Sequence, residues 1–334
     1  MQLSYAQNLE DYHLDLLFSD VARGTYVDVG GGHPVADNVS FHAYLRGWRG
    51  LVVEPQEDLA RLYAGVRPRD QVVSCLAGRR SGTIDFHVVE GLHGLSSTVA
   101  ANAERARGYG AATSVVTKLV EPLSKLIDAA GLGTIQFLKI DVEGAEPDVL
   151  AGLDLERHRP QVILVEAVNP NNLAADVSAW EPSLLASGYV FVFFDNLNRF
   201  YVANEAAHLA QRLPATPAPW DRVAHLWDNG RVAERPDHPD RRLADVLAAG
   251  LFASLPRAVA ETPDLLEMLV KRGLSALEKT GTTPAALKAL IGTAEQPGGP
   301  PTSPQTIDDL IASDAFRAAL GRIACMYDGG HLME

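Results

Sequence analysis

Charged residues interrupt a stretch of the chain, "FLKIDVEG" (137–144), that otherwise has the apolar character of a buried strand. Lys139, Asp141 and Glu143 alternate along this strand and its end, so we expect their side chains on one side of it. Charged groups in such a place need partners, and carboxylates there could accept a proton from a substrate. The structural alternative is an internal ion pair between Lys139 and Asp141 that holds the end of the strand.

Another carboxylate, Glu166, ends the next apolar run, "PQVILVEAV" (160–168). The carboxyl ends of parallel strands share one edge of a sheet, so Asp141 and Glu166 could converge there. Their oxygens suit a hard divalent cation such as Mg²⁺, which would lower the pKa of an acceptor hydroxyl and orient it. A metal-free site with Asp141 or Glu143 as the base fits the sequence equally well.

Three consecutive glycines, residues 30–32, follow the predicted strand "TYVDVG" (25–30). Glycine lets the backbone turn tightly and come close to a ligand. Glu54 ends the next predicted strand, "GLVVEP" (50–55), and its carboxylate could accept hydrogen bonds from both ribose hydroxyls of an adenosine. The spacing therefore suits a cofactor that contains adenosine.

The glycine loop departs from the NAD fingerprint G-x-G-x-x-G, because Val35 stands where the third glycine should be. Asp28 at the strand end would repel a diphosphate, but it suits a cationic or amine-bearing ligand. S-adenosylmethionine has a sulfonium, an ammonium and no phosphate, so these residues favour it over NAD. We expect the cofactor to contact Asp28, Gly30, Gly32, Asn38, Glu54 and Pro55.

Apolar runs alternate with helical patterns from residue 25 to about 202, which predicts an α/β fold with a doubly wound, mostly parallel seven-stranded sheet. Segments 70–78 and 82–90 are the expected third and fourth strands, and 190–195 with 199–204 a closing antiparallel pair. Apolar spacings of three and four after residue 230 predict helices. We therefore expect a catalytic domain over 1–230 and a helical extension over 231–334.

The segment "FLKIDVEGAEPDVLAGLD" (137–154) resembles the FkbM-type S-adenosylmethionine-dependent methyltransferases. Residues 26–56 resemble the first motif of that family and its acidic second strand, and "GLHGLSS" (91–97) resembles its loop after the fourth strand. The resemblance covers roughly residues 3–225, and it implies O-methylation of a sugar, a glycan or a hydroxylated metabolite. Many members have Ala-Asn after the first loop glycine, where this chain has Gly31 and Gly32.

A histidine, His93, lies in the glycine-flanked loop "GLHGLSS". Its ordinary pKa suits proton abstraction near neutrality, so His93 is a further catalytic candidate beside Asp141, Glu143 and Lys139. A solvated loop histidine is the structural alternative. Ser96 and Ser97 could bond to a sugar or to the carboxylate of the cofactor.

Composition narrows the classes of partner. The formal net charge is −13 without a long basic run, which argues against nucleic-acid binding. Cys75 and Cys325 are the two cysteines of the chain, too few for a disulfide framework, so we expect a reducing, cytoplasmic compartment. The first residues lack signal-peptide features, and no apolar run approaches the roughly 20 residues of a membrane span.

Alternatives to an O-methyltransferase of sugars, glycans or glycosylated metabolites remain at this stage. The acceptor could be a polyketide or a peptide, and two further classes are a nicotinamide-dependent oxidoreductase and an interaction protein with a degenerate methyltransferase domain. The expected partner is a small-molecule or glycan acceptor. The apolar stripes of the helical extension need burial, as a lid on the main domain, at a docking surface or in a homodimer.

Overall fold

The computed structural model describes residues 3–89, 93–108, 110–168, 177–254, 270 and 306–326. Contacts divide the chain into two compact units, with the boundary between His225 and Leu226. Each unit is described separately below.

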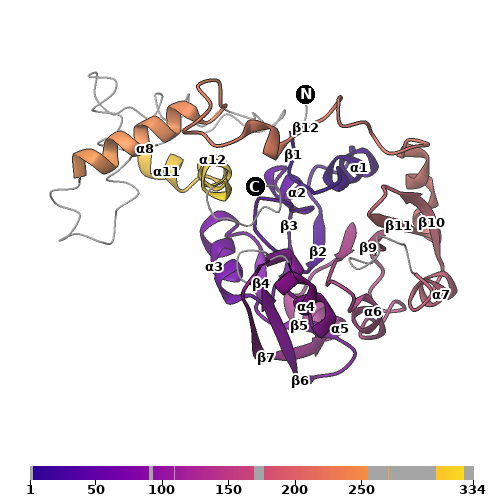
Figure 1. The fold of residues 1–334 in the computed structure, drawn as a ribbon. Helices are drawn as coiled ribbons and strands as arrows, with labels where there is room; N and C mark the ends of the chain where they lie inside the picture. Colours follow the sequence, from indigo (N-terminus) through magenta and orange to yellow (C-terminus); the bar gives the residue numbers. More distant parts are fainter. Residues whose placement is uncertain are drawn as a thin grey trace. The chain divides into compact units, whose positions relative to one another are not determined.

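A seven-stranded sheet forms the centre of the first unit, in the order β10-β11-β9-β8-β2-β3-β4 (Figure 1). The strands are β2 (Thr25–Val29), β3 (Arg49–Val53), β4 (Gln71–Val73), β8 (Phe137–Ile140), β9 (Val162–Glu166), β10 (Tyr189–Phe194) and β11 (Asn198–Ala203). The pairings from β9 to β4 are parallel, whereas β11 runs antiparallel to both of its neighbours. The sheet is therefore mixed: its pairings from β9 to β4 match the mostly parallel arrangement that was expected, and its antiparallel part lies at the β10–β11 end.

The antiparallel pair has a local cause. Only residues 195–197 separate β10 from β11, and so short a connection joins antiparallel strands, because a parallel crossover needs a dozen residues or more. The predicted closing pair is thus confirmed. The inner strands are long apolar runs in which consecutive residues are buried, such as Val27, Leu138 and Ile163 at 0% exposure. Burial of successive residues means that both faces of the sheet are covered.

Short helices alternate with these strands. They are α1 (Glu10–Leu17), α2 (Phe41–Leu45), α3 (Glu57–Val66), α5 (Leu123–Ala130), α6 (Glu146–Ala151) and α7 (Glu181–Ala186). The 3₁₀ helix η2 (Asn204–Arg212) follows β11, and β12 (Ala224–His225) pairs in parallel with β1 (Leu3–Ser4). The beginning and the end of the first unit are thereby joined.

A second, three-stranded sheet has the order β5-β7-β6, with β5 (Leu76–Gly78), β6 (Gly82–Val89) and β7 (Thr113–Pro122). The predicted third strand, 70–78, is divided between β4 of the main sheet and β5 of this one. The predicted fourth strand, 82–90, is β6 and lies outside the main sheet. Strand β7 was not predicted; its return pairing with β6 is set by contacts far along the chain, across η1 (His93–Leu95) and α4 (Ala100–Gly108).

The second unit contains η3 (Leu226–Asn229), α8 (Arg241–Ser254), α11 (Ile307–Ile311) and α12 (Asp314–Cys325). Its core consists of Leu243, Val246, Val270, Leu310, Phe316 and Ala319. Thr306 and Asp309 form the capping box that starts α11, and the predicted helices at 241–255 and 306–326 are observed. Two further predicted helices, 263–279 and 283–294, lie almost entirely outside the described residues.

Both cysteines, Cys75 and Cys325, are buried and have free thiols. Among the helices that the structure describes, none combines the length and the apolar character needed to cross a lipid bilayer.

Helix α1 carries a buried histidine, His13, which packs against Phe193 and Phe200 of the β10–β11 hairpin. Its Nε2 accepts a hydrogen bond from the backbone N–H of Ala218 at 3.2 Å. Burial lowers the pKa of His13 to about 4. The neutral ring therefore fastens the loop around Ala218 to the sheet.

We expect acid to destabilise the first unit through His13. Its folded-state pKa is below the ordinary value, so the unfolded chain takes up the proton first, and the free energy of unfolding falls as the pH drops from about 6.5 towards 4. His13→Gln keeps an acceptor for Ala218 but does not titrate. Urea unfolding at pH 7.5, 6 and 5 should show wild type losing about 1–3 kcal/mol relative to the variant. Parallel pH profiles for the two proteins would contradict this.

Candidate active site

The five parallel strands, from β9 to β4, end at one edge of the main sheet. In the register, Asp28 of β2 lies beside Lys139 of β8, and Ile140 lies beside Val165 of β9. The residues that follow these strands, among them Gly30, Glu54, Asp141 and Glu166, therefore meet at one edge. Ligands of open α/β sheets bind outside the carboxyl ends of the strands.

The glycine loop follows β2 and turns tightly over the end of β8. Gly30 has a φ of 76°, and a Cβ there would lie 1.7 Å from the carbonyl oxygen of Asp141. A Cβ on Gly31 would lie 2.4 Å from Cγ1 of Val52. Both positions therefore need glycine for packing, whereas a Cβ on Gly32 would meet nothing within 4 Å. The loop is open to a ligand at Gly32.

Glu54 lies directly beside this loop and is 2% exposed. Its Oε2 accepts a hydrogen bond from the N–H of Gly32 at 2.8 Å, and its Oε1 accepts one from the N–H of Gln56 at 2.7 Å. These two donors hold the carboxylate in one orientation, and each oxygen retains a further lone pair. Burial raises the pKa of Glu54 to about 7.

Three other predicted cofactor residues, Asp28, Asn38 and Pro55, are buried. Asp28 is fully buried, accepts a hydrogen bond from Ser40 Oγ at 2.6 Å and lies 3.7 Å from the Lys139 ammonium. Asn38 is buried and donates to the carbonyl of Gly31 at 2.8 Å. Pro55 is also buried. Asn38 therefore supports the loop, and a direct contact of any of the three with a cofactor stays a prediction.

Sequence reasoning missed Arg67, whose side chain is fully buried beneath the loop. It forms an ion pair with Asp70 at 2.7 Å and donates to Asn38 Oδ1 at 2.9 Å. The rings around the guanidinium belong to Tyr26, Phe41, Tyr44 and Tyr63, with centroids 4.9–5.9 Å away. In the sequence, "RPRD" (67–70) has the composition of a solvated turn, so no local signal reveals this burial.

Lys139 joins the loop to the strand ends. Its ammonium lies 3.1 Å from Asp141 and donates to the carbonyl of Gly30 at 3.0 Å. Burial lowers the pKa of Lys139, but the charges of Asp141 and Asp28 outweigh burial and hold the pKa above its usual value. The lysine is therefore a charged internal bridge, as in the structural alternative considered from the sequence.

Three carboxylates, those of Asp141, Glu143 and Glu166, converge next to this lysine. Each offers an oxygen within 4.8 Å of the others. Burial raises the pKa of Glu143 and of Glu166 well above the ordinary value, and the charge of Asp141 adds to both increases. The site therefore combines mutual repulsion among carboxylates with the neighbouring ammonium of Lys139, and it favours the uptake of a proton or of a cation.

The turn after β8, rather than strand alternation, directs Glu143. Its φ is 55°, a left-handed conformation that is unusual for a side-chain-bearing residue. Ser97 donates to the carbonyl oxygen of Glu143 at 2.8 Å. Glu146, which sequence reasoning had not singled out, accepts from the N–H groups of Val142 and Gly144, at 3.1 Å each. These hydrogen bonds, from Ser97 and to Glu146, hold the strained backbone of the turn in place.

The segment that carries His93 packs against the same turn. The backbone of His93 belongs to η1, but its side chain lies outside the described residues. Ser96 Oγ accepts from the N–H of Val89 at 3.0 Å and donates to Gln56 Oε1 at 3.3 Å. Ser96 therefore joins this segment to Gln56, and Ser97 joins it to Glu143. A direct role for either serine in binding stays a prediction.

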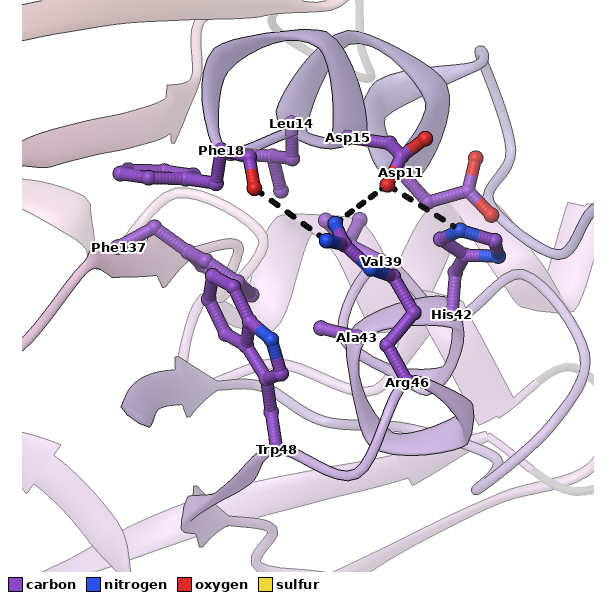
Figure 2. Close-up of a pocket in the computed structure, with 10 residues that line it drawn as sticks. All are labelled: Asp11, Leu14, Asp15, Phe18, Val39, His42, Ala43, Arg46, Trp48 and Phe137. Carbon is purple, nitrogen blue, oxygen red and sulfur yellow. Dashed lines mark hydrogen bonds and ion pairs between the residues drawn. The ribbon is translucent and has the colours of Figure 1, made fainter. Parts of the chain in front are cut away.

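A pocket detected in the first unit lies away from this edge (Figure 2). It is lined by residues of α1 and α2 together with Trp48 and Phe137, which mark the amino ends of β3 and β8. Figure 2 shows Arg46 reaching from α2 to Asp15 and to the carbonyl of Phe18. We assign no part of the chemistry to this pocket, because the convergent carboxylates lie at the opposite ends of the strands.

The glycine loop and the convergent carboxylates lie at the carboxyl edge of the sheet, which is where α/β domains bind their ligands. Residues 28–191 match the family model described as the methyltransferase FkbM domain. This part of the chain is therefore an FkbM-type methyltransferase domain, and the resemblance seen in the sequence is confirmed. No curated protein and no solved structure matches the chain.

We expect the carboxylate cluster to cost stability. Glu166→Gln removes one repelling charge and should raise the melting temperature by about 2–4 °C, measured by calorimetry with a chelator present. Asp141→Asn should lower it, because the buried Lys139 ammonium loses a partner. Glu205→Gln, which breaks an exposed pair with Arg159, serves as the control and should change little. A drop for Glu166→Gln would contradict the repulsion.

Proposed function

We propose that the protein is an S-adenosylmethionine-dependent O-methyltransferase that acts on a hydroxyl of a sugar, a glycan or a glycosylated metabolite. The observation that carries this proposal is the placement of the Asp141, Glu143 and Glu166 carboxylates on the same sheet edge as the glycine loop and Glu54. This placement would bring a nucleoside-type ligand and a proton acceptor together within a methyltransferase domain.

Three features of the loop suit S-adenosylmethionine. Glu54 is held by two backbone N–H groups, so its remaining lone pairs are oriented for the hydroxyls of a ribose. The space at Gly32 admits a ligand close to the backbone. The Asp28 charge beneath the loop favours a cation over a diphosphate. Bound there, S-adenosylmethionine would supply a methyl group on a sulfonium, the chemistry of an in-line displacement.

The chain's own residues would then orient the acceptor and accept its proton. Burial has raised the pKa of Glu143 and Glu166, and a carboxylate with a raised pKa is a better base near neutrality. Lys139 keeps Asp141 in place through their 3.1 Å contact. The turn held by Ser97 and Glu146 keeps Glu143 directed into the cluster.

A divalent cation such as Mg²⁺ fits the same residues. Asp141, Glu166 and also Glu143 each offer a hard oxygen ligand. A bound cation would relieve the repulsion by Asp141, which contributes to the raised pKa of Glu143 and of Glu166. The metal would lower the pKa of the acceptor hydroxyl. In the metal-free version of the proposal, Asp141 or Glu143 is the base and Lys139 provides the compensating charge.

The acceptor class rests on the family resemblance. A polyketide or peptide hydroxyl is the alternative acceptor for the same chemistry. A nicotinamide-dependent oxidoreductase is disfavoured because the loop has Val35 in place of a third glycine. A non-catalytic interaction protein is disfavoured because Glu54, Asp141 and Glu143 are all present and brought to one edge.

The cofactor assignment can be tested by ligand binding. S-adenosylmethionine should raise the melting temperature of the wild type, whereas NAD and NADP should not. Glu54→Gln should weaken the binding of S-adenosylmethionine at least tenfold by calorimetry, because the amide nitrogen would face the N–H groups of Gly32 or Gln56. The affinity of the wild type should rise about tenfold from pH 6 to pH 8, as Glu54 loses its proton with a pKa of about 7.

Glu57→Gln is the matched control for this measurement, because Glu57 follows Glu54 closely in sequence but pairs with Lys118 at the surface. Its affinity and pH dependence should equal those of the wild type. Unchanged binding by Glu54→Gln, or a shift in melting temperature with NAD alone, would refute the cofactor assignment.

Metal use can be tested separately. Methyl transfer to a panel of sugars should fall at least tenfold after treatment with a chelator and return on addition of Mg²⁺. Glu166→Gln should need more Mg²⁺ for half-maximal activity, whereas the surface control Glu205→Gln should behave like the wild type. Full activity in the chelator would leave the metal-free base, Asp141 or Glu143, as the mechanism.

A further inference from the structure

We propose that Arg67 is a positioning residue for the cofactor site: through Asn38 it sets the orientation of the Gly31–Gly32 peptide, and through that peptide it aligns Glu54. The role in cofactor binding rests on the proposed function. The network itself belongs to the fold, and it can be measured without any cofactor.

The guanidinium of Arg67 is held from several sides. Its Nε and one terminal nitrogen contact Asp70, at 2.8 and 2.7 Å. The same terminal nitrogen donates to Ser40 Oγ and to the hydroxyl of Tyr26, at 2.8 and 2.9 Å. Its other terminal nitrogen donates to Asn38 Oδ1 at 2.9 Å. A side chain with 0% exposure and this many partners has one available orientation.

This contact decides which way the amide of Asn38 faces. Its oxygen accepts from Arg67, so its nitrogen must face the loop, where it donates to the carbonyls of Gly31 at 2.8 Å and His33 at 3.1 Å. The hydroxyl of Tyr63 donates to the same Gly31 carbonyl at 2.8 Å. Two donors therefore hold this oxygen on the inner side of the loop.

The planar trans peptide carries that constraint to Glu54. The carbonyl of Gly31 and the N–H of Gly32 point in opposite directions, so holding the carbonyl inward aims the N–H at Glu54 Oε2, 2.8 Å away. The flipped peptide would place a carbonyl oxygen against the Glu54 carboxylate. Two adjacent glycines resist such a flip poorly, and a side chain at Gly31 would collide with Val52, so the loop needs an external anchor.

The test compares Arg67→Met and Arg67→Lys with Arg69→Met. Arg69 is a matched control, because it also stacks on Tyr44 and donates to backbone carbonyls of Tyr44 and Trp48. Amide hydrogen exchange of residues 30–36 should be at least tenfold faster in Arg67→Met and unchanged in Arg69→Met. The Kd of S-adenosylhomocysteine should rise at least tenfold in Arg67→Met, less in Arg67→Lys, and less than twofold in the control.

A double-mutant cycle distinguishes positioning from general destabilisation. If Arg67 acts through Asn38, the effects of Arg67→Met and Asn38→Ala on the Kd should be far less than additive. Additive effects, or equal loop exchange in the Arg67 and Arg69 variants, would overturn the proposal. Should Arg67→Met not fold, the same comparisons apply to Arg67→Lys. A wild type that binds neither S-adenosylmethionine nor S-adenosylhomocysteine would refute the proposed function, while the exchange comparison would still decide the role of Arg67.

Discussion

The ammonium of Lys139 is the charge on which the carboxyl edge of the sheet depends. It lies 3.1 Å from Asp141, 3.7 Å from Asp28 and 3.0 Å from the carbonyl of Gly30, so one group touches the strand end, the strand beneath the loop and the loop. Without it, buried carboxylates would face one another without compensation. Buried carboxylates can gather at this edge because this ammonium is buried among them.

The compensation of these carboxylate charges is incomplete. Glu143 and Glu166 have raised pKa values because burial and the neighbouring charge of Asp141 disfavour their ionised forms. Their repulsion costs stability, and the two glutamates readily take up a proton or a cation. The left-handed turn at Glu143 is a second local cost in the same place. Such concentrations of strain and repulsion are typical of active sites.

Two buried cations, Lys139 and Arg67, contact different parts of this edge. Lys139 organises the carboxylates at the ends of β8 and β9, and Arg67 organises the loop after β2 and the residues behind it.

The pattern of apolar runs predicted most of the main sheet correctly, including the pair β10–β11. It erred at 70–78, where a single apolar run is divided between two sheets, and it missed β7. A run of apolar residues does not say which sheet it joins, because pairing is decided by distant partners.

For the site, the sequence by itself determined the glycine loop, Glu54 and the charged residues from Lys139 to Glu143, because their residue types and spacing are local properties of the chain. It also indicated that Asp141 and Glu166 could meet at one edge. Only the tertiary structure decided that Glu143 reaches the cluster through a left-handed turn, and that Asp28, Asn38 and Arg67 are buried. Burial and long-range contact convert a solvated-looking "RPRD" into an anchor, and neither is encoded in local pattern.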